Sequence, residues 1–273
     1  MAEVTIQDLL LAGCHFGHLT RRWNPKMKKY IFMERNGIHI IDLKKTHEAL
    51  NTARAQIKEL VQQGGTVLLV GTKKQAKDII QLEAERCGMP YVSERWLGGT
   101  LTNFITIKKS TKRLKNLEKK ATDGTYDKLT KKEILTIERE KEKLYTILGG
   151  IKDMNHLPSA LYVIDAKKEE IAIREGSRLG IPIFALLDTN SDPDPIDFPI
   201  PSNDDAFKAI NLITHALTDA IIEGRSGRIE MKTAESAEGS DMITSDMAAE
   251  EDGEGNKDKK LRRKKYSKVF DND

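Results

Sequence analysis

The chain has 273 residues, of which 32% are charged and only 5% are aromatic, and its formal net charge is +3. That length suits one large domain or one domain with an insertion, and no apolar run approaches the roughly 18 residues that a membrane helix needs. The N-terminus has acids and no basic region ahead of its apolar part, so we expect no secretory signal. Cys14 and Cys87 are isolated, which fits reduced thiols in a cytosolic protein better than a disulfide.

The charge is unevenly distributed along the chain. Residues 230–254 contain nine acids and one lysine, so the rest of the chain has 44 basic and 33 acidic residues, a net charge of +11. Residues 257–268 then add eight basic residues against one acid. A basic body indicates a polyanion as partner, most commonly nucleic acid. A merely solubilising surface is the simpler alternative.

The first 62 residues predict a helix, a basic loop, a β-hairpin and a second helix. The helix covers Ile6–Ala12, and the loop His18–Tyr30 is rich in cations and contains Trp23. Two alternating apolar runs flank Asn36-Gly37, a strong signal for a two-residue hairpin turn. Helical spacing of apolar residues then predicts a helix over 46–62.

The middle of the chain alternates buried strands with helices. Continuous apolar runs predict four parallel strands, at 66–71, 90–93, 160–166 and 181–188. Helices are expected over 74–87, 169–179 and about 203–223. This pattern is typical of an α/β fold with a parallel sheet covered by helices on both faces. The loops at the carboxyl ends of the strands are then the functional edge.

Residues 104–154 break this alternation. Two leucine- and isoleucine-spaced stripes, separated by residues 122–125, predict an antiparallel coiled-coil hairpin inserted into the α/β domain. The domain itself would comprise residues 1–103 and 155–226. The hairpin is either a solvated coiled coil or a docking element for RNA or a protein neighbour. Residues 227–273 lack apolar periodicity and predict a disordered tail, acidic and then basic, whose basic end either binds polyanions or lies free.

The sequence motifs give little indication of a catalytic or metal-binding site. The loop after the first buried strand, GTKKQA, contains one glycine where a phosphate-binding loop needs several. Cys14, His15 and His18 could hold a metal such as zinc, but there is no second cluster of Cys and His, so a fourth ligand would have to be a carboxylate or His39. Packed side chains are the favoured interpretation. The aspartate-rich run 188–206 could suggest a magnesium site, yet its four prolines favour a rigid capping loop.

Several long motifs resemble one family. They are GCHFGHLTRRWNPKMKKYIF, NGIHIIDL, VLLVGTKKQA, RWLGGTLTNF, DMNHLPSALYVIDAKKEEIAIRE and LGIPIFALLDTNSDPDPIDFPIPSNDDA, and they occur in the order found in the bacterial small-subunit ribosomal protein uS2 family. The similarity covers roughly residues 3–226. It implies a flavodoxin-like sheet with a protruding coiled-coil hairpin. It also implies a structural role in the cytoplasmic ribosome, with no required cofactor and no catalysis. The implied partners are small-subunit rRNA, other small-subunit proteins and ribosomal protein one, which captures mRNA.

From these patterns we expect RNA contacts at one set of cations and polar side chains. Cations would neutralise phosphates, and hydroxyl or amide groups would hydrogen-bond to phosphate or ribose. The expected residues are Arg21, Arg22, Trp23, Asn24, Lys26, Lys28, Lys29, Lys73, Lys74, Arg95, Thr100, Thr102, Asn103, Lys108, Lys109 and Arg113. Trp23 and Trp96 either stack on a base or pack internally. The alternative function is that of a non-ribosomal α/β nucleotide-binding enzyme.

Overall fold

A small antiparallel sheet forms the N-terminal part of the fold. The computed structural model describes residues 4–123, 126 and 130–251. After α1 (Ile6–Leu11), strands β1 (Phe16–Leu19), β2 (Ile31–Arg35) and β3 (Ile38–Ile41) pair in the order β1-β3-β2. The turn between β2 and β3 has positive φ at both central residues, 52° at Asn36 and 70° at Gly37, so the predicted hairpin is confirmed.

Strand β1 was missed by the sequence pattern because it is short and contains Gly17. A Cβ atom at this glycine would lie 2.6 Å from Cγ2 of Thr189. The glycine therefore lets the small sheet come close to the loop that contains Thr189. Two 3-10 turns, η1 (Thr20–Arg22) and η2 (Pro25–Tyr30), connect β1 to β2.

The main sheet has five parallel strands in the order β5-β4-β6-β7-β8. Its bounds are β4 Val67–Val70, β5 Tyr91–Val92, β6 Ala160–Ile164, β7 Ile183–Leu187 and β8 Phe198–Pro201. Alternate residues enter two apolar clusters, one on each face: Val67 and Leu69 on one side, Leu68 and Val70 on the other. This two-sided burial explains why the strands read as continuous apolar runs, and the predicted α/β class is confirmed.

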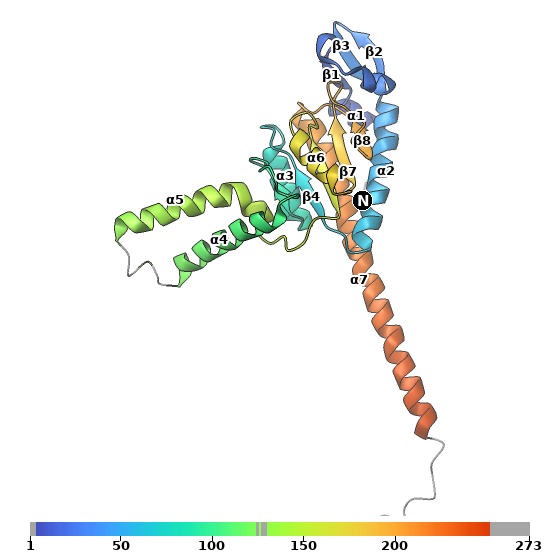
Figure 1. Cartoon of the computed structure of the whole chain (residues 1–273). Coiled ribbons are helices and arrows are strands. Elements are labelled where there is room, and N and C mark those ends of the chain that lie inside the picture. Colours follow the sequence, from blue (N-terminus) through green and yellow to red (C-terminus); the bar gives the residue numbers. More distant parts are fainter. Residues whose placement is uncertain (1–3, 124–125, 127–129, 252–273) are drawn as a thin grey trace, which may run out of the picture. The chain divides into compact units, whose positions relative to one another are not determined.

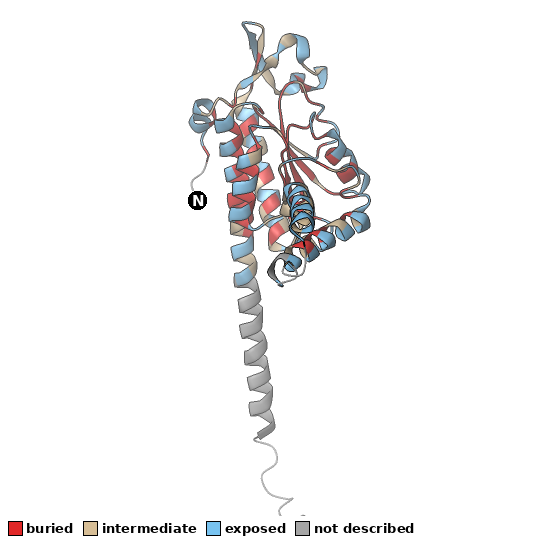
Figure 2. Cartoon of the chain, turned by 90° about the vertical axis from the view of Figure 1, so that its left-hand side faces the viewer, coloured by how far each residue is buried: buried red, intermediate tan, exposed pale blue. Residues whose placement is uncertain are grey.

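Helices cover both faces of the sheet (Figure 1). Residues of α2 (Leu43–Gln62), α3 (Lys77–Cys87) and α7 (Phe207–Glu251) pack in the first cluster. Residues of α6 (Glu170–Arg178) pack in the second, together with the base of α4 (Phe104–Thr122), the end of α5 (Lys131–Leu148) and the turn η4 (Gly149–Ile151). Buried residues gather along the strands and on the helix sides that face them (Figure 2).

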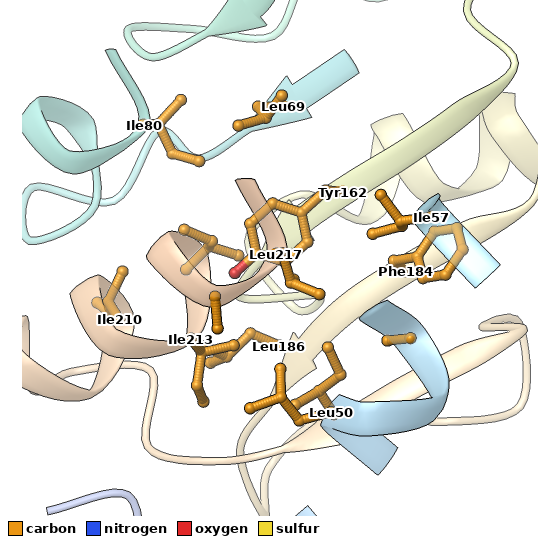
Figure 3. Packing of buried hydrophobic residues seen from close by; sticks show 14 of the residues in the cluster. Leu50, Ile57, Leu69, Ile80, Tyr162, Phe184, Leu186, Ile210, Ile213 and Leu217 are labelled. Atoms are coloured by element: carbon orange, nitrogen blue, oxygen red, sulfur yellow. The ribbon is translucent and has the colours of Figure 1, made fainter. Parts of the chain in front are cut away.

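The first cluster joins elements that are far apart in the sequence. Leu217 of α7 lies beside Tyr162 of β6, and Ile57 of α2 lies beside Phe184 of β7 (Figure 3). The side chain of Tyr162 is fully buried, and its hydroxyl satisfies its hydrogen-bonding capacity with the hydroxyl of Thr214 at 3.0 Å. Burial of each such aliphatic side chain contributes about 1.5–3 kcal/mol.

Strand β8 corrects the sequence interpretation of residues 188–206 as only a rigid loop. Its sequence, FPIP, pairs in parallel with β7 from Phe198 to Pro201. Proline cannot donate to a ladder, but β8 lies at the edge of the sheet, where one side of the strand needs no donor. Ile200 is completely buried, so this strand is part of the core.

The inserted segment forms two helices that contact each other, α4 and α5. Ile107, Leu114 and Leu117 of the first predicted stripe are buried, whereas Ile134, Ile137 and Leu144 of the second are half-buried. Thr130 and Glu133 form a capping box at the start of α5. The coiled-coil character of this pair stays a prediction, and most of the predicted turn between the helices lies outside the described residues.

Helix α7 continues to Glu251, beyond the expected end near residue 223. Its buried positions Ile210, Ile213, Leu217 and Ile221 keep the predicted spacing. The chain divides into two units, residues 1–226 and residues 227–273. A disordered tail over 227–273 stays a prediction, and residues 252–273 lie outside the described part. No helix among the described residues combines the length and apolar character that crossing a bilayer requires.

Candidate nucleic-acid interface

The basic loop, residues 20–30, is held by a buried anchor and presents its cations outward. Met27 is fully buried, and the amide of Asn24 donates to the carbonyl of Thr189 at 2.8 Å. The Asn24 side chain accepts from the amide of Lys26 at 3.0 Å and starts the turn η2. The exposed charges are Arg21, Arg22, Lys26, Lys28 and Lys29.

The cations of this loop differ in whether the protein already neutralises them. The ammonium of Lys26 lies 2.8 Å from Asp192 and 2.5 Å from Asp194. Arg21, Arg22 and Lys28 have no ion pair with any described residue, and Lys29 lies over the ring of Tyr30 at 4.9 Å. Trp23 is half-buried beside His39, with ring centroids 5.0 Å apart.

Lys73 differs most from its expected role. Its ammonium contacts three carboxylates, Asp204 at 2.7 Å, Asp205 at 2.6 Å and Asp165 at 3.4 Å. Burial opposes its charge, yet the hydrogen bond to Asp204 and the surrounding negative charges raise the pKa of Lys73 above its usual value. Its neighbour Lys74 is exposed and has no hydrogen bond or ion pair within the described residues.

The carboxylates beside Lys73 belong to a cluster that could hold a metal ion. His18 Nδ1 lies 2.7 Å from Asp188 Oδ2, and ligand atoms of His18, Asp188 and Asp204 all lie within 4.8 Å of one another. Asp204 is fully buried, and its Oδ2 has no hydrogen-bond partner among the residues that the structure describes. Burial, followed by the negative charges of Asp165 and Asp188, raises the pKa of Asp204 to about 7.

Cys14 and His15, which the sequence grouped with His18, do not join this cluster. No group of three metal-ligating side chains among the described residues includes either of them. Burial raises the pKa of the Cys14 thiol to about 11, so it is protonated at neutral pH. The sequence placed the metal candidates next to each other along the chain, whereas the fold draws the aspartates from the ends of β7 and β8.

The loop Arg95–Phe104 wraps around one carboxylate, that of Glu175 on α6. Five donors reach it: Trp96 Nε1 at 3.2 Å, the amides of Gly99, Leu101 and Thr102 at 2.7, 2.9 and 3.0 Å, and the Thr102 hydroxyl at 3.2 Å. Burial alone would raise the pKa of Glu175, but these hydrogen bonds outweigh it and the pKa is lowered. The protein therefore fills with its own carboxylate a nest of donors that would suit an external anion.

This arrangement turns several expected RNA-binding groups inward. Trp96 is buried, which agrees with internal packing rather than base stacking. Thr100 is 2% exposed and its hydroxyl donates to the carbonyl of Leu97 at 2.6 Å. Arg95 and Asn103 remain exposed, and Asn103 makes no side-chain hydrogen bond to the start of α4.

Only one of the two adjacent glycines needs to be glycine for its backbone. Gly99 has a φ of +89°, a left-handed value that its neighbour Gly98 does not share. A Cβ atom at Gly98 would meet nothing within 4 Å, whereas one at Gly99 would lie 3.3 Å from Asn103 Cβ. Gly99 bends the loop so that its amide reaches Glu175.

The cations of α4 are likewise divided into paired and unpaired ones. Lys108 donates to the carbonyl of Asn155 at 2.9 Å, and Arg113 pairs with Glu140 of α5. Lys109 and Lys112 are exposed, with no hydrogen bond or ion pair to a described residue.

Comparison with known proteins points to one family. The sequence model of the family described as Ribosomal protein S2 matches residues 9–224. The chain is 56% identical over 232 residues to the small ribosomal subunit protein uS2 of Chlorobium chlorochromatii, covering 85% of this chain and 92% of that protein. It is 52% identical over 257 residues to the uS2 protein of Chlorobium phaeovibrioides, covering 93% and 100% of the two chains. The uS2 protein of Chlorobaculum tepidum is 55% identical over 247 residues, covering 90% and 96%.

Proposed function

The chain belongs to the ribosomal protein S2 family, and from that premise we propose that it docks on small-subunit rRNA through cations that its own carboxylates leave unpaired. As a member of this family it is a structural protein of the small ribosomal subunit and not an enzyme. The alternative of a non-ribosomal nucleotide-binding enzyme is thereby set aside.

One observation carries the docking proposal, namely the division of the cations into two classes. We call unpaired cations those that are exposed and make no hydrogen bond or ion pair with a described residue. Among the residues expected to contact RNA, the side chains that meet this definition and also lie over no aromatic ring are Arg21, Arg22, Lys28, Lys74, Arg95 and Lys109, and Lys112 on α4 shares the property. Phosphate groups can approach these side chains without displacing an internal partner.

The remaining expected contacts have mostly internal roles. Lys26, Lys73 and Arg113 hold loops or helices through carboxylates, and Thr102 holds the loop to Glu175. We therefore propose that Asn103 is the polar side chain of that loop which reaches RNA.

Two neighbouring lysines of the basic loop provide a test that is matched in net charge. Lys28→Ala and Lys26→Ala each remove one positive charge from the same turn, but only Lys28 is unpaired. We expect Lys28→Ala to weaken binding of the full chain to small-subunit rRNA about fivefold, because a non-specific Kd of about 10⁻⁴–10⁻⁶ M shared among several phosphate contacts gives roughly that factor for each contact. Lys26→Ala should weaken it clearly less. Equal losses for the two variants would mean that net charge, and not direct contact, determines the affinity.

The proposed role also includes recruitment of ribosomal protein one. The small sheet exposes apolar side chains that suit contact with a protein partner, since Phe32 is 70% exposed and Met33 and Phe16 are about half exposed. Replacement of Phe32 by alanine should reduce capture of ribosomal protein one by assembled subunits. Unchanged capture would assign the recruitment to another surface.

No cofactor is required for this role, but one cation site is proposed. One imidazole and two carboxylates, His18, Asp188 and Asp204, form a donor set that suits zinc better than magnesium, and the partnerless Asp204 oxygen could act as a ligand. Lys73 competes for this carboxylate. Metal analysis of the dialysed chain should find zinc that the Asp204→Asn variant lacks, and zinc retained by that variant would refute the site.

A further inference from the structure

A crevice lies at the carboxyl ends of the parallel strands, at the point where the chain reverses the direction in which it adds strands to the sheet. From β4 the chain passes through α3 to β5 on one side, whereas β6 lies on the other side of β4. Loops that leave neighbouring strands in opposite directions open a crevice, which is where ligands bind in open α/β sheets. The crevice has a volume of about 720 Å³ and is lined by the loops after β4, β5 and β6.

The mouth of this crevice is suited to a phosphate. Lys74 and Arg95 line it, and both are exposed and unpaired among the described residues. Lys168 also lines it, with its ammonium held by the carbonyl of Thr72 at 2.9 Å. The other cation, Lys77, is paired with Glu94 and adds no free charge.

The floor of the crevice holds a carboxylate with unused capacity to accept hydrogen bonds. Glu169 is 3% exposed, and its Oε1 accepts from the amide and the hydroxyl of Thr72. Its Oε2 makes no hydrogen bond within the described part of the chain. Burial disfavours the charged carboxylate and raises the pKa of Glu169. A ligand that donates a hydrogen bond to Oε2 would offset part of this desolvation cost.

Two apolar side chains also line the crevice. Ile171 is 55% exposed at the rim, and Trp96 lines the wall with its ring fixed by the hydrogen bond to Glu175. A flat heterocycle can stack against such side chains.

We propose that this crevice binds an unpaired cytidine or adenosine of rRNA and recognises the exocyclic amino group of its base. The phosphate lies at Lys74 and Arg95, and the amino group of cytosine or adenine donates to Glu169 Oε2. The inference rests on the proposed docking to rRNA, and it adds base selectivity to contacts that otherwise read only the backbone.

The test isolates the amino group. Labelled five-residue RNAs of cytidine or adenosine are each compared with the analogue that lacks only the exocyclic amino group, using fluorescence anisotropy with the full chain. At least one amino-bearing RNA should bind about tenfold tighter than its analogue, because a hydrogen bond to a charged group is worth roughly that factor. The preference should fall to about twofold or less in Glu169→Gln, whose amide matches the shape but not the charge.

Controls separate failure of this inference from failure of docking. Glu170→Gln changes the neighbouring exposed carboxylate, which pairs with Arg174, and should keep the preference. Equal binding of each RNA and its analogue, with salt-dependent binding of whole rRNA intact, would overturn the crevice inference alone. If the wild-type chain does not bind whole rRNA at all, the docking proposal is overturned as well. Displacement by free CMP or AMP as effective as by the oligomers would overturn the assignment to RNA.

Discussion

The loop Arg95–Phe104 should depend for its stability on the carboxylate of Glu175. Glu175→Gln keeps the size of the side chain but places an amide group, itself a donor, against part of a five-donor nest. Leu101 and Trp96 are buried, so their N–H groups cannot readily turn to water when an acceptor is lost. Hydrogen bonds to a charged group are worth about 1.5–3 kcal/mol, so we expect the free energy of unfolding to fall by about 2 kcal/mol.

The pH dependence of this loss tests its electrostatic cause. Because the pKa of Glu175 is lowered in the folded state, its stabilisation is present above the unfolded pKa of about 4.3 and is lost as the pH falls through the folded value. Urea unfolding followed by circular dichroism should therefore show a gap between wild type and variant at pH 7 that shrinks toward pH 3. Glu170→Gln, a surface change on the same helix, should cost less than about 1 kcal/mol.

Two outcomes would refute this reasoning. A Glu175→Gln variant within about 0.5 kcal/mol of wild type at pH 7 would mean that water replaces the carboxylate at little cost. A loss of about 2 kcal/mol that stays constant down to pH 3 would mean that packing, and not the charge, is responsible.

Three further substitutions test local features of the fold by the same unfolding measurement. Gly99→Ala should cost about 1 kcal/mol because its φ is +89°, whereas Gly98→Ala, which meets open space, should change stability by less than about 0.5 kcal/mol; equal effects would contradict the role of the left-handed backbone. Ile200→Ala should cost about 2–5 kcal/mol if β8 is a core strand, and a loss below about 1 kcal/mol would return it to a surface loop. Glu83→Ala should cost about 2–3 kcal/mol because its buried carboxylate accepts from the hydroxyl of Thr218 at 2.6 Å, and no loss would show that the contact between α3 and α7 does not need it.

The sequence predicted the α/β class because both faces of the sheet are buried, which makes each central strand a continuous apolar run. It did not reveal β8, since prolines usually exclude a strand and only the edge position permits them here. The short strand β1 was hidden for a similar reason, because Gly17 serves a close approach that no local pattern displays.

The sequence predicted which cations belong to the candidate interface, but not which of them are free of internal partners. A cation run indicates a polyanion partner, yet the sequence cannot tell that Lys73 meets Asp165, Asp204 and Asp205, which come from loops after β6 and β8. The sequence analysis also missed Glu175. This carboxylate lies on the same side of its helix as the buried residues Ala172, Ile173 and Gly176, and a buried carboxylate needs hydrogen-bond donors from within the protein.

The salt dependence of rRNA binding tests the docking proposal most directly. The logarithm of the association constant of the full chain for small-subunit rRNA should fall linearly with the logarithm of the salt concentration. Replacement of one unpaired cation such as Arg22 by alanine should reduce that slope by about 0.7–0.9. Binding that is independent of salt, or a slope that Arg22→Ala and Lys28→Ala both leave unchanged, would contradict docking through the unpaired cations.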